Sequence, residues 1–395
     1  MTLQSPKQKR RGLKGGLDNA IRQAEERGFY KMQIIDSDCH QMEPFLDFAK
    51  YCEEPYKTML LARDPEADPW FAKRLKSQVQ PFGPKIQTQH AMKGIKFLKR
   101  PETTYPSFQQ LKELIDVFTN LMHNIGIKRS VIFPTTLLGL PESQAKFEVG
   151  VAKGYMRYML DNFLGKYPEI LTTIYVPTND PPRAAELIDD IGSEKGIVGV
   201  MISGGARTLA GSDELDPIYQ AAQKKGLPIC FHSHLSVGSY PLGLEVMPFI
   251  GYHALSFPLS IIRHFVSVVV TGLPVRYPNL RFVFIEGGIT WIPWLMNRLD
   301  DEYIKRKLEA PLLSKFPSEY MREFYYTSQP LEQAHKEDLE FYFSKINAEK
   351  HLMYASDYPH WDFDVPSVIS DLPFLSSTAK KNILGENAIK LFHLN

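Results

Sequence analysis

The 395-residue chain carries 46 lysine and arginine residues against 45 aspartate and glutamate residues, and 44% of its residues are hydrophobic. The resulting formal net charge of +1 offers no broad field for nucleic acid or an anionic membrane, and the apolar fraction predicts a large folded core. The cysteines are Cys39, Cys52 and Cys230, an odd number, and we recognise no secretory leader or membrane-spanning stretch. We therefore expect a cytoplasmic protein that binds neither nucleic acid nor a membrane.

Residues 1–31 form a basic leader, whose charge run KQKRRGLKGG we expect to be a solvated tail. Beyond it, short β-branched or aromatic runs alternate with helical stretches, a pattern typical of parallel sheets with crossover helices. These runs cover 32–38, 130–135, 172–177, 197–203, 228–234, 281–287, 324–329 and 351–357. We predict an α/β fold, a (β/α)₈ TIM barrel over 32–395, with a doubly wound open sheet as the alternative.

Two segments interrupt this alternation. About residues 45–110 lie between the first two runs, far more than a βα loop needs, and we interpret them as an inserted lid. Residues 236–258 form a second long loop at the same end of the predicted barrel, so the two segments would together cover a pocket. The lid contains basic residues that would either meet a substrate carboxylate or lie in solvent. They are Arg63, Arg74, Lys85 and Lys93.

Polar side chains follow three of the runs. Asp38 and His40 are two residues apart, so on an extended strand both side chains point to the same face. His232 ends the fifth run and Asp357 ends the eighth. A mixed set of carboxylate and imidazole groups suits Zn²⁺, Mn²⁺ or Fe²⁺, so we predict that Asp38, His40, His232 and Asp357 bind a divalent metal.

Other groups near the strand ends have two interpretations each. His234 and Asp362 would be either ligands or capping residues. Glu286 closes the sixth run, and because an unpaired buried carboxylate is unfavourable it should meet a metal or a cation such as Arg298. His253 would point into the pocket or cap a loop. Nucleophilic serine and phosphate-binding motifs are absent from the sequence, which disfavours those chemistries.

Five segments in order resemble the amidohydrolase superfamily, specifically the amidohydrolase-related branch that includes aminocarboxymuconate-semialdehyde decarboxylase and the resorcylate decarboxylases. The segments are IIDSDCHQMEP, GIKRSVIFPT, DELDPIYQAAQKKGLPICFHSH, RYPNLRFVFIEGGITWIPWLMNRLD and YASDYPHWD. The resemblance implies a metal held at the barrel mouth by the same four predicted ligands. It also implies that Asp357 acts as a base when metal-bound water attacks a carbonyl.

The resemblance leaves three functions open. Decarboxylases of this branch place a histidine where this chain has Glu286, which slightly favours hydrolysis of a C–N or C–O bond over non-oxidative decarboxylation of a small carbonyl or carboxylate compound. Catalytic roles would fall to Asp357, Glu286 and His253. Alternatively, Glu286, His253 and His360 would complete a second metal position, as in a few dinuclear iron or iron/manganese monooxygenases of the branch. The third alternative is a non-catalytic barrel subunit, and aromatic-rich loops favour a homo- or hetero-oligomer.

Overall fold

Eight parallel strands form one sheet in which each strand pairs with the next along the chain. The computed structural model describes residues 13–41, 45–61, 119, 122–234, 249–333, 335–358, 360 and 362–394. The strands are β1 (Ile34–Gln41), β2 (Ile127–Pro134), β3 (Ile170–Tyr175), β4 (Ile197–Ser203), β5 (Ile229–His232), β6 (Phe282–Ile285), β7 (Tyr325–Thr327) and β8 (Leu352–Met353). All eight predicted runs are therefore confirmed as strands, in the predicted order.

The sheet closes into a barrel where β1 meets the segment that follows β8. The Ser37 amide donates to the carbonyl of Tyr354 over 2.9 Å, and the Asp357 amide donates to the carbonyl of Asp38 over 2.8 Å. The next contact along this seam is a parallel bridge between Cys39 and Tyr358. The first and last strands are thus joined, and the alternative of an open sheet is excluded.

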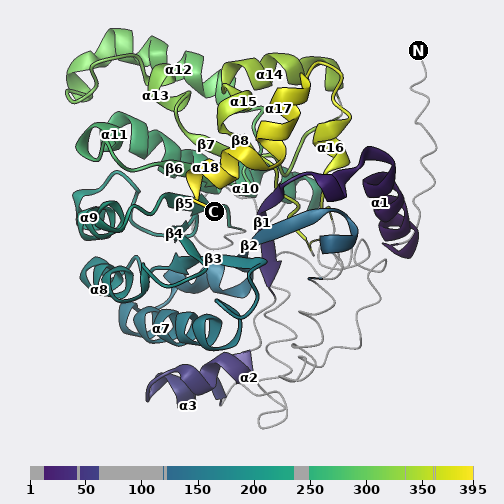
Figure 1. Cartoon of the computed structure of the whole chain (residues 1–395). Helices are drawn as coiled ribbons and strands as arrows, with labels where there is room; N and C mark the ends of the chain where they lie inside the picture. Colours follow the sequence, from purple (N-terminus) through teal and green to yellow (C-terminus); the bar gives the residue numbers. More distant parts are fainter. Residues whose placement is uncertain are drawn as a thin grey trace.

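Helices surround the strands, as Figure 1 shows. The crossover helices are α7 (Ala145–Asn162), α8 (Pro181–Ile191), α9 (Asp216–Lys225), α10 (Phe249–Val270), α11 (Leu273–Arg276), α12 (Ile292–Arg306), α13 (Pro317–Met321), α14 (Leu339–Lys345) and α15 (Ala348–His351). The last helices are α16 (Ser367–Ser370), α17 (Ser377–Lys381) and α18 (Asn387–Leu391). Local sequence sets their ends: the Asp180 side chain caps α8, and Gly226 ends α9 with a φ of 69°.

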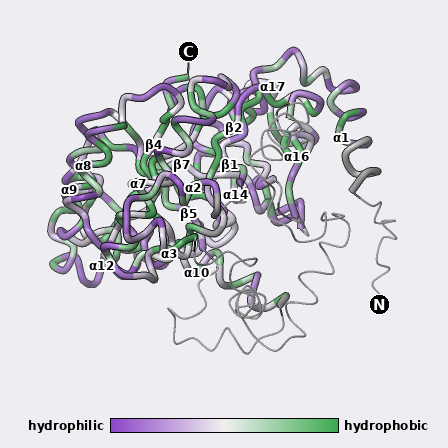
Figure 2. Tube along the Cα trace, turned by 90° about the horizontal axis from the view of Figure 1, so that it is seen from below, coloured by the Kyte–Doolittle hydropathy of each residue, from purple (hydrophilic) through white to green (hydrophobic). Residues whose placement is uncertain are grey.

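The core lies between the strands and the inner faces of these helices. Figure 2 shows hydrophobic residues concentrated along the central strands and hydrophilic residues on outer helices such as α8, α9 and α12. Phe265 of α10 illustrates this packing, because its ring centroid lies 4.5 Å from that of Phe284 in β6 and 5.4 Å from that of Phe324. Such ring clusters fix the outer layer against the barrel.

Helix α10 corrects the prediction that residues 236–258 form one loop. The helix begins at Phe249 and contains Pro258, although proline is unfavourable inside a helix. Burial of Ile261, Phe265 and other apolar side chains against the barrel outweighs that local preference. By length and composition α10 would also be able to cross a membrane, but 44% of its apolar window is buried inside this fold. Residues 235–248 lie outside the described part of the chain.

The described parts of the leader and of the predicted lid both pack against the body. Helix α1 (Leu13–Arg27) meets α16, where Arg27 pairs with Asp371 at 2.7 Å and the Ser367 hydroxyl donates to Gln23 (Figure 1). Helices α2 (Phe45–Phe48) and α3 (Tyr56–Leu61) lie beside α7. The rest of the predicted lid, which includes the four basic residues named above, lies outside the described residues, so its covering role stays a prediction.

The buried histidine of α10 makes stability depend on pH. His264 is fully buried, and its Nδ1 atom accepts a hydrogen bond from the Ala210 amide. Burial, assisted by the nearby Arg263 charge, lowers the pKa of His264 from 6.5 to about 3. Below pH 6.5, His264 therefore binds a proton in the unfolded chain but not in the native chain. The free energy of unfolding consequently decreases as the pH falls from 6.5 towards 3.

We expect His264→Asn, which keeps an acceptor near the Nδ1 position, to weaken this pH dependence. Between pH 6.5 and 5, the free energy of unfolding of the wild type should fall more steeply than that of the variant, by about 1 kcal/mol per pH unit. Urea unfolding of both proteins at several pH values measures the difference. Parallel curves would show that His264 does not cause the loss.

Candidate metal centre

The predicted ligands converge at the carboxyl ends of the strands, the end at which barrel enzymes carry their sites. Asp38 and His40 lie on β1, and His232 is the last residue of β5. Asp357 follows β8 and is placed by the seam described above. All four side chains are buried, with at most 4% of each residue exposed.

The distances between their polar atoms are those of groups that share an ion. His40 Nε2 lies 3.2 Å from Asp357 Oδ1 and 3.6 Å from Asp38 Oδ1. His232 Nε2 lies 3.3 Å from the same Asp38 oxygen. Asp38, His40 and His232 each offer a ligand atom within 4.8 Å of the others. One imidazole nitrogen or carboxylate oxygen of each residue therefore points at a common centre.

Two atoms of this group make no hydrogen bond with any described residue. They are His40 Nε2 and Asp38 Oδ2, and both are buried. Buried polar atoms are rarely left without a partner, because each forfeits its hydration. A divalent cation would satisfy both atoms, and a donor set of two imidazoles and two carboxylates suits Mn²⁺, Fe²⁺ or Zn²⁺. The residues present thus fit a metal.

The two histidine rings are oriented by contacts on their far sides. His232 Nδ1 lies 2.8 Å from the carbonyl of Ser233, so its Nε2 faces the centre. His40 Nδ1 lies 3.3 Å from the hydroxyl of Thr135, at the end of β2. Such outer contacts fix the tautomer of a metal-binding imidazole. Sequence reasoning missed Thr135 and Ser233, whose only signal was their position at the end of an apolar run.

A second group of ligand atoms overlaps the first. It consists of His40, Glu286, Asp357 and His360, again within 4.8 Å of one another. His360 Nδ1 lies 2.6 Å from Asp357 Oδ1 and 3.9 Å from Glu286 Oε1. On its other side, Glu286 accepts a hydrogen bond of 2.6 Å from the Ser233 hydroxyl. His40 belongs to both groups of ligand atoms, and Asp357 to the second.

The pKa values of the two carboxylates in the second group, Glu286 and Asp357, are shifted in opposite directions. Burial raises the pKa of Glu286 well above its usual range, and the charges of Asp357 and Asp38 raise it further. Burial alone would also raise the pKa of Asp357, but the charge of His360, its hydrogen bond to Asp357 and the nearby His40 ring hold that pKa well below its usual range. His360 gains a raised pKa from Asp357, despite its burial. The pKa of Glu286 is thus shifted upwards and that of Asp357 downwards, so a proton favours Glu286 over Asp357.

Both of these carboxylates sit on strained backbone. Glu286 has a φ of 58° and Asp357 a φ of 57°, in the left-handed region that non-glycine residues rarely adopt. Strain of this kind costs on the order of 1–3 kcal/mol and persists where the surroundings enforce it. Its presence at two facing strand ends indicates that the fold places these side chains at the expense of local stability.

The structure also shows where the other residues singled out in the sequence lie. Arg298 pairs with Glu302 at 2.9 Å, so it is not the partner of Glu286. His253 lies at the rim, 25% exposed, with Nε2 3.9 Å from Asp362 Oδ2, and neither residue belongs to the two ligand groups. His234 is partly buried, its amide donates to the Ser260 hydroxyl, and it belongs to neither ligand group. Roles for His253 in catalysis or in a second metal position stay predictions.

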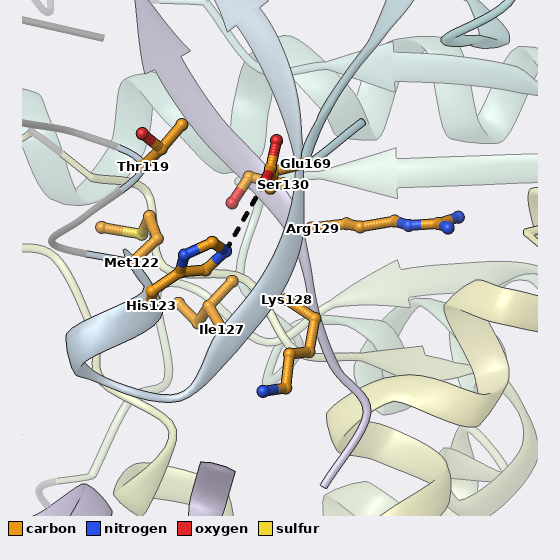
Figure 3. A pocket seen from close by; sticks show the side chains of 8 residues that line it. All are labelled: Thr119, Met122, His123, Ile127, Lys128, Arg129, Ser130 and Glu169. Atoms are coloured by element: carbon orange, nitrogen blue, oxygen red, sulfur yellow. Dashed lines mark ion pairs between the residues drawn. The ribbon is translucent and has the colours of Figure 1, made fainter. Parts of the chain in front are cut away.

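A small pocket lies at the opposite end of the barrel, where β2 begins. Figure 3 shows the side chains around it, including the ion pair of 4.0 Å between His123 and Glu169. Its cavity volume is about 10 Å³, enough for roughly one water molecule. This pocket is too small for a substrate and lies away from the predicted ligands.

Comparisons with known proteins agree with this architecture. A sequence model of the amidohydrolase family matches residues 108–394. No match was found among curated proteins. The 5-carboxyvanillate decarboxylase LigW from Sphingomonas paucimobilis is 20% identical, with a TM-score of 0.63 over 92% of this chain and 100% of that one.

Two further solved structures are similar over the same share of this chain, 92%. A dihydroxybenzoic acid decarboxylase from Polaromonas sp. JS666, with bound manganese and the inhibitor 2-nitroresorcinol, is 17% identical over 98% of its length, with a TM-score of 0.64. An amidohydrolase from Mycobacterium avium subsp. paratuberculosis K-10 is 18% identical over 99% of its length, with a TM-score of 0.68. At these identities the likeness shows the fold alone.

Proposed function

Since this chain belongs to the amidohydrolase family of enzymes, we propose that it removes the carboxylate group of a small aromatic acid as CO₂, in a divalent-metal-dependent and non-oxidative reaction. The observation that carries the proposal is the convergence of Asp38, His40, His232 and Asp357 on one buried centre, where two buried polar atoms make no hydrogen bond with any described residue. The substrate class comes from the similar structures, two of which are decarboxylases of hydroxylated benzoic acids, one with bound manganese.

In the proposed reaction, some residues bind the metal and others transfer protons. The four predicted ligands would hold the ion, which when bound would stabilise negative charge that builds on substrate oxygens. As the bond between the ring carbon and the carboxylate breaks, its electron pair stays on the carbon and CO₂ leaves. Glu286, whose buried carboxyl group has a raised pKa, is the proposed acid that donates a proton to the carbon. His360 lies beside Glu286 and Asp357 and is placed to return a proton from the mouth.

Removing the metal tests the proposal directly. We expect protein stripped with a chelator to lose its activity on hydroxybenzoates, measured as CO₂ release and loss of substrate absorbance, and to regain it on addition of Mn²⁺. The physical reason is that the ring carbon cannot hold the developing charge without the cation. Unchanged turnover by protein that elemental analysis shows to be metal-free would overturn the proposal.

Hydrolysis of a C–N or C–O bond is the second candidate, and one observation favours it. Glu286 stands where a histidine was expected for a decarboxylase, and its side chain faces the centre with Asp357 and His360. The same metal-loaded protein distinguishes the two reactions. Cleavage of a small amide or ester without CO₂ release would establish hydrolysis.

The number of ions is a separate part of the proposal. We infer one ion at the four predicted ligands and allow a second position at Glu286 and His360, whose group also contains the predicted ligands His40 and Asp357. The solved structures described above are two decarboxylases and an amidohydrolase, so they do not favour the dinuclear monooxygenase. Elemental analysis of protein purified without chelator counts the ions per chain.

Assembly and location stay predictions. Several apolar side chains of α12 and the segment that follows it are exposed, among them Trp294 at 60% and Leu308 at 94%. Exposed aromatic and aliphatic groups of this kind are consistent with the predicted homo- or hetero-oligomer. A cytoplasmic location is likewise proposed on composition and the three buried, free cysteines.

A further inference from the structure

One layer beneath the predicted ligands lies a carboxylate to which no role has yet been given. Asp36 precedes Asp38 by two residues on β1, so the two side chains share a face of the strand. Asp36 is fully buried. None of the ion pairs found among the described residues involves Asp36, so its partners are hydrogen-bond donors rather than a cation.

These donors come from across the seam of the barrel. The Ser356 amide donates to Asp36 Oδ1 over 2.8 Å, and the Ser356 hydroxyl bonds to Oδ2 over 2.5 Å. A third donor is the amide of Asp38, at 3.3 Å from Oδ1. Both carboxylate oxygens are therefore used, and one side chain holds the backbone that precedes Asp357 and the backbone that carries Asp38.

Ser356 in turn holds the far side of Asp357. Its hydroxyl oxygen accepts a hydrogen bond of 3.0 Å from the Tyr358 amide, and its carbonyl accepts one of 2.8 Å from the Asp364 amide. Asp357 itself lies between these contacts in the left-handed conformation, with its amide bonded to Asp38. A strained residue keeps its place only where several contacts enforce it, and here those contacts lead back to Asp36.

We propose that Asp36 is a positioning residue for the metal centre, which acts through Ser356 to set the placement of Asp38 and Asp357. The inference rests on the proposed metal-dependent function and deepens it. Asp36 touches neither the substrate nor the ion. It determines whether two ligands from strands at opposite ends of the sequence present their oxygens to the same point.

The chain offers a matched control in Glu148. This carboxylate is also fully buried and also accepts backbone donors, from Thr178 and Asn179, at 3.0 Å each. It belongs to α7 and contacts the segment after β3, away from the ligand groups. Glu148→Gln should therefore lower stability in the same way as Asp36→Asn, without touching the metal centre.

The experiment measures Mn²⁺ binding to chelator-stripped full-length protein by calorimetry, together with the melting temperature of each stripped protein. We expect Asp36→Asn to weaken Mn²⁺ affinity by about 10- to 100-fold, the usual effect of losing a contact that orients a ligand. Glu148→Gln should keep wild-type affinity. Electron paramagnetic resonance of bound Mn²⁺ should change in Asp36→Asn and not in the control.

Ser356→Ala, which removes only a hydroxyl group, serves if Asp36→Asn does not fold. It should weaken Mn²⁺ binding in the same direction, and the double variant should lose less than the sum of the two single effects. Equal Mn²⁺ affinity in Asp36→Asn or Ser356→Ala and in the wild type would overturn the inference alone. A wild-type protein that binds neither Mn²⁺, Fe²⁺ nor Zn²⁺ would overturn the proposed function, and the inference with it.

Discussion

Replacing Asp357 with asparagine is expected to lower kcat/KM by about 10³-fold while the fold stays intact. The carboxylate lies 3.2 Å from His40 Nε2 and 2.6 Å from His360 Nδ1, so it contacts a predicted ligand and a histidine of the second group. The amide removes its charge and one oxygen. Asparagine also tolerates the left-handed backbone at this position, which a larger change would disturb. Steady-state kinetics on the metal-loaded variant measure the loss.

Asp364→Asn is the control for this experiment. That carboxyl group is also largely buried, and burial raises its pKa to about 7, but it bonds to the backbone of Leu331 rather than to the ligands. Its substitution should leave kcat/KM within a few-fold of the wild type. Full activity of Asp357→Asn, with metal bound, would show that the centre lies elsewhere.

The second large effect is expected at Glu286. Glu286→Gln keeps the shape of the side chain and an acceptor for the Ser233 hydroxyl, but it removes the proton that burial holds on the carboxyl group. If that proton goes to the substrate carbon, kcat should fall by about 10²- to 10³-fold with little change in KM. Glu286→His should recover part of the loss, because an imidazolium also carries a proton.

The control here is Glu332→Gln, because Glu332 also has a raised pKa and makes hydrogen bonds to Ile289 and Thr290 just beyond Glu286, although the residue is exposed. It should change kcat little. A Glu286→Gln enzyme with normal kcat and a raised KM would instead assign Glu286 to substrate binding. Loss of one of two ions in Glu286→Gln would support the second metal position.

The fold could be predicted from the sequence because strands that are buried on both faces consist of continuous apolar runs. The sequence placed strand ends less well. The predicted first run stops at Asp38, yet β1 continues to Gln41, because His40 and Gln41 still pair with β2 although their side chains are polar. The predicted eighth run extends to Asp357, yet regular pairing with β7 covers only Leu352 and Met353. Beyond that point the chain turns to β1 instead.

The four predicted ligands could be found because each follows an apolar run, and parallel strands bring their carboxyl ends together. What could not be found is which polar neighbours orient them. Thr135, Ser233 and Ser356 are ordinary hydroxyl residues in the sequence, and their roles depend on contacts between strands. The same limit applied to Glu286. From the sequence it could meet either a metal or Arg298, and only the structure shows that Arg298 pairs with Glu302 instead.

The seam between β1 and the segment after β8 sets the order in which this enzyme can mature. Asp36 and Ser356, which meet there, are 320 residues apart. Because chains are synthesised from the N-terminus at about 5–20 residues per second, Asp38 and His40 leave the ribosome well before Asp357 exists. The growing chain therefore carries an incomplete ligand set during most of its synthesis. Metal acquisition at the complete site is necessarily a late event, and a ribosome that stops short of the last strand yields a product that lacks this centre.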